Sequence, residues 1–359
     1  MKLLIIGFSL KNFMPFIYKY EKILLENDVN YDVFLFDRTK NDNVIKNDNI
    51  IYYNKLVKSG ESKLKKIIPY IGYKKHLTRV IKSNKYEKFI VLTTPPAVFI
   101  NKLLIKKYRN SYIFDYRDYS HEKIKWYKNN VDNIIKNSYC TFISSKGFMD
   151  YLNTSDKIYI SHNINSFDYT HKPIDDLKNK NNINIGFVGY VRYYNPNIKL
   201  IYSLRNSDTF SLSYYGEAYN GCDINEYCRL NDIKNVKVQS YYENKDKYKI
   251  YESISIINAL YDVNSEDTIR ALPNRLYDAA IYKKPILVSK GTYLAELVLQ
   301  YGIGLCIDVL TDDIEKALNE YIEHFSIIEF QNNCNRFLED IKSDEIVFER
   351  KIADFVNNI

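Results

Sequence analysis

The chain lacks the long apolar runs that mark membrane-spanning or secreted proteins. Its 359 residues contain no stretch of about 18 apolar residues, the length that a transmembrane helix needs. The apolar run Leu3–Phe8 is too short for a signal peptide and predicts a first β-strand instead. We therefore expect a protein without a transmembrane helix or a secretion signal.

Cysteine pairs and the common short catalytic motifs are missing as well. The five cysteines are scattered without a Cys-x-x-Cys, and the histidines show no metal-ligand spacing. We therefore expect free thiols in a reducing cytoplasm and no metal site. The chain also contains no Gly-x-Gly-x-x-Gly, no Gly-x-x-x-x-Gly-Lys-[Ser/Thr] and no Gly-x-Ser-x-Gly, so none of these motifs assigns a reaction.

The composition that remains is globular, with an uneven positive charge. Hydrophobic residues make up 46% and charged residues 26%, as in folded soluble proteins, and the length predicts two domains of about 150 residues each. The net charge is +7, and it is concentrated between Lys55 and Lys107, where fourteen basic residues stand against Glu61 and Glu87.

Within this basic segment, apolar and aromatic residues alternate with lysine and arginine, as in LKKIIPYIGYKKHLTRVIK. This mixture predicts a surface helix or helix pair on anionic lipid headgroups, where each basic residue contributes about 1 kcal/mol. A solvated basic face above an inner core stripe is the alternative. Nucleic acid would suit such a patch, but no known binding motif accompanies it, and we expect no nucleic-acid partner.

Apolar strands alternate with helical segments in both halves of the chain, which predicts two doubly wound parallel sheets. The first such domain is expected over residues 1–165 and the second over residues 183–340. Residues 166–182 are polar and include a proline, so they predict a linker. Residues 341–359 predict a C-terminal helix that packs back on the first domain.

The segment Leu272–Ile307 carries the clearest local pattern. Pro273 and Asn274 open a predicted helix, and an apolar strand, a second helix and a short strand follow. Such a helix start attracts phosphate through free N–H groups and its dipole. Asp278, one turn further, is placed to accept hydrogen bonds from a ribose diol. The alternative is an ordinary βαβ unit in which Asp278 is a solvated helix charge.

This segment resembles the donor site of retaining GT-B glycosyltransferases of family 4, whose pattern is roughly P-x-K-x-x-E-x-x-A-x-G-K-P-V-I. Here Pro273 is followed by Arg275 in place of Lys, Asp278 in place of Glu, and Lys284-Pro285-Ile286, without the usual Gly. In the expected order, FDYRDYSHE, TFISSKGFMDYL, IYISHNIN and IGFVGYVRYYN resemble other family segments. The resemblance implies an α/β GT-B fold, with two Rossmann-like domains facing across a cleft.

The resemblance also implies donor-binding residues. Gly189 and Arg192 follow a predicted strand where the family places a basic residue against the diphosphate, with Lys199 as a downstream candidate. Arg192 as an exposed loop charge is the alternative. The loop from Tyr261 to Leu272 is expected to cover the donor sugar. Asn274 and Arg275 offer backbone N–H groups at the helix start, and the Arg275 side chain is a candidate to reach phosphate. Arg270 stands where the family has its upstream acid, so either Arg270 binds phosphate instead, or the loop is rearranged and Glu266 or Asp267 is the nearby acid.

In the first domain, the polar cluster DYRDYSHE follows a predicted strand. Here His121 is positioned to hydrogen-bond the donor sugar and Asp118 to orient the acceptor hydroxyl. An ion pair between Arg117 and Asp118 that caps a helix is the alternative.

The function implied is transfer of a sugar, with retention, from a UDP- or GDP-linked donor to a hydroxyl of a surface glycan or polyprenyl-diphosphate-linked acceptor. The setting would be bacterial capsule, lipopolysaccharide or exopolysaccharide synthesis, with the enzyme peripheral on the inner face of the plasma membrane. Absence of an Asp-x-Asp argues against an obligatory metal, and no cofactor beyond the nucleotide-sugar is expected. The alternatives are a non-catalytic GT-B-like subunit of a partner transferase and a nucleotide-sugar 2-epimerase.

Overall fold

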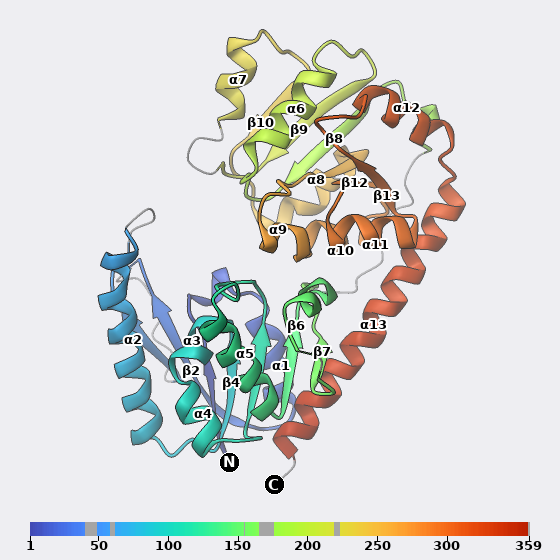
Figure 1. Ribbon diagram of the computed structural model, residues 1–359. Helices are drawn as coiled ribbons and strands as arrows, with labels where there is room; N and C mark the ends of the chain where they lie inside the picture. Colours follow the sequence, from blue (N-terminus) through green and yellow to red (C-terminus); the bar gives the residue numbers. More distant parts are fainter. Residues whose placement is uncertain (40–48, 58–61, 154, 165–175, 219–222, 358–359) are drawn as a thin grey trace. The chain divides into compact units, whose positions relative to one another are not determined.

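The computed structural model describes residues 1–39, 49–57, 62–153, 155–164, 176–218 and 223–357. It divides into two compact units, which are described separately (Figure 1). Unit 1 comprises Met1–Asn165 together with Ser343–Ile359, and unit 2 comprises Ser166–Lys342.

Unit 1 is built on a seven-stranded parallel sheet in the order β3-β2-β1-β4-β5-β6-β7. Helices follow most of the strands, and this alternation of apolar strands and amphipathic helices produces the doubly wound arrangement predicted from the sequence. The strands are β1 Lys2–Ile6, β2 Asn30–Asp37, β3 Ile50–Asn54, β4 Lys88–Leu92, β5 Tyr112–Tyr116, β6 Cys140–Ile143 and β7 Ile158–Ile160.

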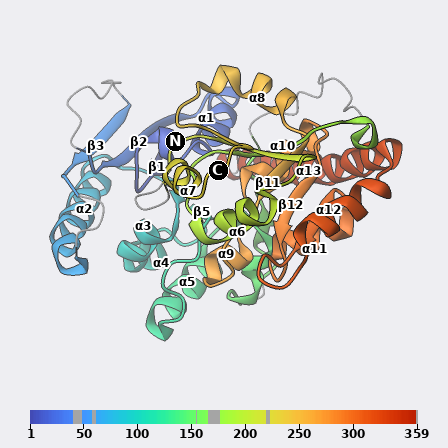
Figure 2. The ribbon, with the colours of Figure 1, turned by 90° about the horizontal axis from the view of Figure 1, so that it is seen from above.

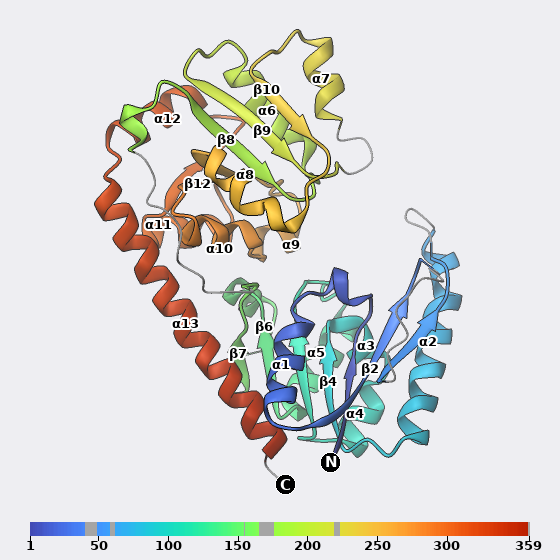
Figure 3. The same ribbon diagram turned by 180° about the vertical axis from the view of Figure 1, so that it is seen from behind.

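Helices cover both faces of this sheet. α1 (Ile17–Glu26) and the end of α13 lie on one face, while α3, α4 and α5 lie on the other (Figures 1 and 3). Figure 2 shows α2 and β3 together at one edge of the sheet. The remaining helical segments of unit 1 are η1 Lys11–Phe13, α2 Lys63–Ser83, α3 Thr94–Phe99, α4 Asn101–Lys107, α5 Lys125–Asn137 and η2 Lys146–Asp150.

The last helix, α13, runs without interruption from Ile327 to Asn357, and its C-terminal part belongs to unit 1. Phe348, Ile352 and Phe355 are buried in the same core cluster as α1 and the strands. This packing is fixed by polar contacts: Lys19 forms an ion pair of 2.5 Å with Glu345, and the His162 backbone N–H donates to the same carboxylate. The apolar face and these ion pairs together hold the tail against unit 1.

Unit 2 contains a six-stranded parallel sheet in the order β10-β9-β8-β11-β12-β13. Its strands are β8 Ile183–Val188, β9 Phe210–Tyr215, β10 Val236–Gln239, β11 Ile256–Ala259, β12 Ile286–Ser289 and β13 Gly304–Ile307. Its helical segments are η3 Leu177–Asn179, α6 Tyr194–Leu204, α7 Ile224–Leu230, η4 Asn244–Asp246, α8 Lys247–Ser253, α9 Glu266–Arg270, α10 Asn274–Ile281, α11 Tyr293–Tyr301 and α12 Ile314–Glu323. The order reverses between β8 and β11, the place where open α/β sheets bind ligands.

Several segments differ from the sequence-based expectation. The predicted linker at 166–182 falls mostly outside the described residues, and its end carries the short turn η3. The predicted C-terminal helix at 341–359 is the second half of α13, not a separate element. Within the described ranges, the structure has no helix that combines the length and the apolarity needed to cross a membrane.

Candidate functional site

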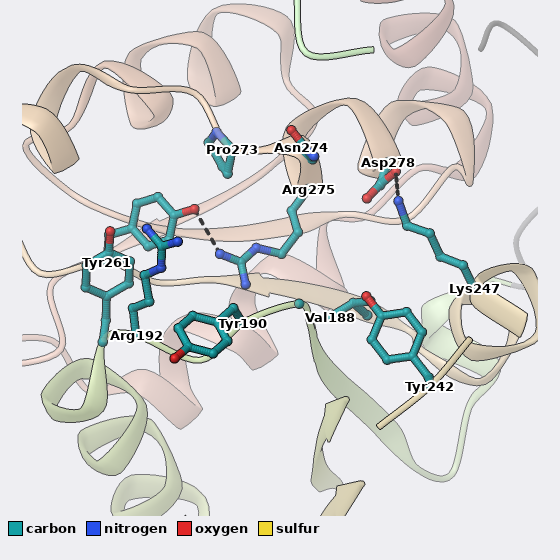
Figure 4. A pocket seen from close by; sticks show the side chains of 12 residues that line it. Val188, Tyr190, Arg192, Tyr242, Lys247, Tyr261, Pro273, Asn274, Arg275 and Asp278 are labelled. Atoms are coloured by element: carbon teal, nitrogen blue, oxygen red, sulfur yellow. Dashed lines mark hydrogen bonds and ion pairs between the residues drawn. The ribbon is translucent and has the colours of Figure 1, made fainter. Parts of the chain in front are cut away.

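Unit 2 contains a pocket of about 320 Å³ at the carboxyl ends of β8 and β11, beside the start of α10 (Figure 4). The strand order reverses here, so the loops after two adjacent strands diverge and leave space between them. The lining residues come from the β8–α6 loop, the β10–η4 loop, the start of α8, the β11–α9 loop, and α10 with the proline before it. They are Val188, Gly189, Tyr190, Arg192, Tyr193, Tyr242, Lys247, Tyr261, Pro273, Asn274, Arg275 and Asp278.

Two glycines shape the wall formed by the β8–α6 loop. Gly189 has φ +123° and open space where a Cβ would stand. Gly216, with φ +128°, lies directly against it, because a Cβ on Gly216 would come within 2.3 Å of the Gly189 carbonyl oxygen. The Gly189 N–H donates to the Tyr215 carbonyl. Both positions thus require glycine, and together they bring bare backbone to the pocket.

Arg275 is the central cation of the pocket. Its side chain is 7% exposed, and its guanidinium carbon lies 3.8 Å from the centre of the Phe187 ring. One Nη donates to the Tyr261 hydroxyl at 2.9 Å, and the buried Nε has no hydrogen-bond partner. Among the described residues no carboxylate forms an ion pair with Arg275. A buried cation of this kind is costly unless an anion pairs with it.

Asp278 lies one turn further along α10 and is 8% exposed, so the alternative of a solvated helix charge is wrong. One carboxylate oxygen accepts from Lys247 at 2.9 Å and the other from the Tyr251 hydroxyl at 2.8 Å. Burial raises the pKa of Tyr251 well above its ordinary value, and the Asp278 charge raises it further, so Tyr251 remains a donor. Each carboxylate oxygen has two lone pairs, which leaves acceptor capacity for a ligand.

The charges are distributed unevenly across the pocket. Arg192 and Arg275 lie toward one side, and Asp278, Lys247 and Tyr242 lie toward the other (Figure 4). An anion is therefore favoured at the first side and a group with hydroxyl donors at the second.

The backbone of the β11–α9 loop is anchored by Ser289 at the end of β12. The Ser289 hydroxyl accepts from the Tyr261 N–H at 2.9 Å and donates to the Tyr261 carbonyl at 2.8 Å. The Tyr261 ring in turn packs on Tyr193, with 4.5 Å between ring centres. Burial beside Tyr261 raises the pKa of Tyr193 to about 12, so Tyr193 is a neutral hydrogen-bonding group.

Most predicted donor-site residues therefore meet in one place. Gly189, Arg192, Tyr261, Asn274, Arg275 and Asp278 all line the pocket. Arg270 ends α9 and Lys199 is exposed on α6, and neither is among the lining residues. Glu266 and Asp267 occupy the first turn of α9, also outside the lining.

Lys247 and Tyr242 were missed by the sequence reasoning. The chain contains 35 tyrosines and many lysines, so neither residue stands out from its background. A spacing rule would not have found Lys247 either, since 31 positions separate it from Asp278.

Asp118 and His121 lie in unit 1, on the loop that follows β5, and both side chains are exposed. The His121 ring contacts Tyr127 edge-on at 5.5 Å. The neighbouring Arg117 is buried and forms an ion pair with Asp115, with 2.6 Å between the charged atoms. This pair lies in the interior of unit 1. His162 is buried too and contacts Asp344 at 3.0 Å.

In the part of the chain that the structure describes, no group of three or more histidine, cysteine, aspartate or glutamate side chains is arranged to hold a metal ion. The expectation that no metal is obligatory stays a prediction.

Similarity to known proteins was found only among solved structures. No protein-family model matches the chain, and no curated protein matches its sequence. Among solved structures, the galactosyltransferase WaaB of the lipopolysaccharide outer core is similar over 99% of both chains, with 16% identity and a TM-score of 0.67. Anabaena HepE in complex with UDP is similar over the full length of both chains, with 12% identity and a TM-score of 0.69. WaaG, a glycosyltransferase of lipopolysaccharide biosynthesis, gives 11% identity and a TM-score of 0.63.

These similarities confirm the predicted fold. The two Rossmann-like parallel-sheet domains match the GT-B fold of these similar structures.

Proposed function

We propose that this protein is a glycosyltransferase whose unit 2 holds a nucleotide-diphosphate sugar. The observation that carries the proposal is Arg275, a buried cation without a carboxylate partner in the described chain, one helical turn from the buried carboxylate of Asp278. A nucleoside diphosphate supplies an anion to Arg275 and hydroxyl donors to Asp278. Its phosphates neutralise Arg275, and its ribose hydroxyls donate to Asp278.

In this proposal the diphosphate lies at the side of the pocket formed by Arg275, Arg192 and the start of α10. Guanidinium groups donate two parallel hydrogen bonds to a phosphate, and the first-turn N–H groups of the helix add to the attraction. The leaving diphosphate is thereby neutralised as the glycosidic bond of the donor breaks. Lys247 and Tyr251 hold Asp278 in place for the ribose.

The base is proposed to be uracil. Structures of HepE are described with UDP and with UDP-glucose, and that protein shares the fold of this chain. Tyr242, at the Asp278 side of the pocket, offers an aromatic ring against the base.

For the acceptor we retain the roles proposed from the sequence. Asp118 would orient the acceptor hydroxyl and His121 would hydrogen-bond the donor sugar, with retention of configuration. The acceptor would be a glycan or a polyprenyl-diphosphate-linked sugar in capsule, lipopolysaccharide or exopolysaccharide synthesis. The alternative function is a non-catalytic subunit of a partner transferase, and the one feature that would support it is the absence of the family's upstream acid.

Thermal unfolding with a panel of nucleotides and nucleotide sugars tests the proposal. A ligand at about 100 times its Kd stabilises by about 2.7 kcal/mol, and we expect this with UDP compounds and not with GDP compounds. Asp278→Ala should weaken nucleotide binding about tenfold, the equivalent of one lost hydrogen bond to a charged group. Asp278→Asn, which keeps an acceptor for Tyr251, separates loss of ribose binding from loss of local structure.

No stabilisation of the wild-type protein by any nucleotide would overturn the donor-site proposal. The non-catalytic reading would then be favoured.

We further propose that α2 places unit 1 on the inner face of the plasma membrane. Ile67, Ile68 and Ile71 are exposed on this helix, with Ile68 at 72%, and Lys74 and Lys75 are exposed on the following turn. No acidic residue occurs between Lys63 and Ser83. Exposed isoleucines next to lysines suit an anionic bilayer surface, where apolar side chains enter the interface and the cations meet headgroups.

Replacing Ile68 and Ile71 together with serine should weaken binding to phosphatidylglycerol vesicles about tenfold, since two apolar side chains no longer enter the interface. The control is Leu310→Ser in unit 2, which removes an equally exposed apolar side chain (77%) outside the basic segment. Co-sedimentation with vesicles measures both. Equal binding of the double variant and the wild type would exclude α2 as the membrane contact.

A further inference from the structure

Unit 1 contains a partly buried arginine, Arg38, directly after β2, which has no carboxylate partner among the described residues. Its guanidinium carbon lies 4.3 Å from the centre of the Phe8 ring and 5.2 Å from that of Phe36. One Nη donates to the Phe8 carbonyl at 2.8 Å, and the buried Nε has no hydrogen-bond partner. Most of the donors of this guanidinium therefore have no partner among the residues that the structure describes.

The groups around Arg38 do not balance its charge. The neighbouring residue is Asp37. One of its carboxylate oxygens accepts hydrogen bonds from the Thr39 N–H at 2.9 Å and from the Thr39 hydroxyl at 2.8 Å. The hydroxyls of Tyr70 and Tyr73 are nearby, and Tyr73 donates to the Gly7 carbonyl. Burial lowers the pKa of Arg38, and these tyrosines offset the effect only in part.

The adjoining strand ends carry further unsatisfied polar atoms. Thr93, at the end of β4, has φ +70°, a strained conformation for a β-branched residue. The buried hydroxyls of Thr93 and Thr94 have no hydrogen-bond partner in the described chain. Because β1 lies between β2 and β4, these hydroxyls and Arg38 flank the loop that starts at Gly7. Backbone strain and unsatisfied hydrogen-bond donors at the carboxyl ends of adjacent strands are features of binding sites.

We propose that unit 1 binds a phosphoryl group at the carboxyl end of β2, with Arg38 as its principal ligand. Lys74 is exposed one turn after Tyr70 on the same face of α2, and no acid occurs on that helix, which favours an anion that carries more than one charge. A diphosphate ester meets this requirement. In the context of the proposed function, on which this assignment alone rests, the phosphoryl group belongs to the acceptor substrate.

Calorimetric titration of the full chain with inorganic pyrophosphate at low ionic strength tests the inference. The wild type should bind two equivalents, one in each unit. Arg38→Met, which keeps an unbranched apolar side chain against Phe8, should bind one equivalent, with affinity at the lost site at least tenfold weaker. Arg109→Met, at an exposed arginine of unit 1, is the matched control and should bind two.

The two sites are distinguished by Arg275→Met. If the donor-site proposal fails but this inference holds, Arg275→Met changes nothing and Arg38→Met abolishes a site. Unchanged stoichiometry and affinity in Arg38→Met would overturn the inference. Unfolding curves without ligand verify that each variant is folded, and Arg38→Lys, which keeps the charge but not the guanidinium fork, should bind with intermediate affinity.

The source of the phosphoryl group is resolved by competition against pyrophosphate at the Arg38 site. Geranyl diphosphate as the competitor identifies a soluble diphosphate ester, whereas phosphatidylglycerol vesicles identify a lipid headgroup. If neither geranyl diphosphate nor the vesicles displace pyrophosphate, the site does not bind phosphoryl esters and the proposed role is contradicted.

Discussion

Replacing Arg275 with methionine is expected to weaken binding of nucleoside diphosphates about 100-fold while leaving binding of the free nucleoside nearly unchanged. Hydrogen bonds to charged groups contribute about 1.5–3 kcal/mol each, and a bidentate contact with phosphate contains two of them. Arg275 is poised for such a contact because Tyr261 and Phe187 hold its guanidinium while Nε is uncommitted. The measurement is titration of UDP and uridine into each variant.

The stability of Arg275→Met provides an independent readout. A purely structural arginine would leave the protein less stable when removed, whereas an arginine held for a ligand would not. Because Arg275 is buried without a carboxylate partner in the described chain, methionine packed on Phe187 should not lower the free energy of unfolding. Arg229→Met, at an exposed arginine of α7, is the matched control for loss of one charge. An Arg275→Met protein that binds UDP as tightly as the wild type would exclude this residue from the diphosphate site.

Gly216→Ala is expected to lower the free energy of unfolding by about 3 kcal/mol, combining backbone strain with overpacking. The new Cβ would meet the Gly189 carbonyl oxygen at 2.3 Å, and φ +128° is unfavourable for alanine. Backbone cannot move aside as a flexible side chain can, so the β8–α6 loop must shift. Binding of UDP should fall with it, because Gly189 and Arg192 lie on that loop.

Gly291→Ala is the control, since Gly291 also has positive φ (+78°) but has nothing within 4 Å of the added Cβ. It should lose about 1 kcal/mol, the cost of a left-handed conformation alone. Chemical denaturation measures both variants. Equal losses would show that contact between the two glycines does not constrain the loop.

The sequence predicted the sheets well because their strands are short apolar runs followed by helices. All six strands of unit 2 coincide with apolar segments such as Ile183–Val188 and Ile286–Ser289. Helix α5 was not predicted, since Lys125–Asn137 presents only four buried residues in a polar segment. The C-terminal helix expected over residues 341–359 begins earlier, at Ile327, so that α13 contributes residues to both units.

Site residues were predictable where local geometry decides their place. Pro273 and Asn274 open a helix at a strand end, and this alone positions Arg275 and Asp278. Long-range pairing left no such signal. Lys247 contacts Asp278 because α8 packs beside α10. The guanidinium of Arg38 lies against the rings of Phe8 and Phe36, which are distant in sequence from each other and from α2.

The central claim is that unit 2 recognises a nucleoside through Asp278 and a diphosphate through Arg275. The most direct test is a matched titration of the wild-type protein with uridine, UMP and UDP. The account predicts that affinity rises with each phosphate and that UDP binds about 100-fold more tightly than uridine, as two charge-assisted hydrogen bonds require. Equal affinities for the three ligands, or binding of none, would contradict it.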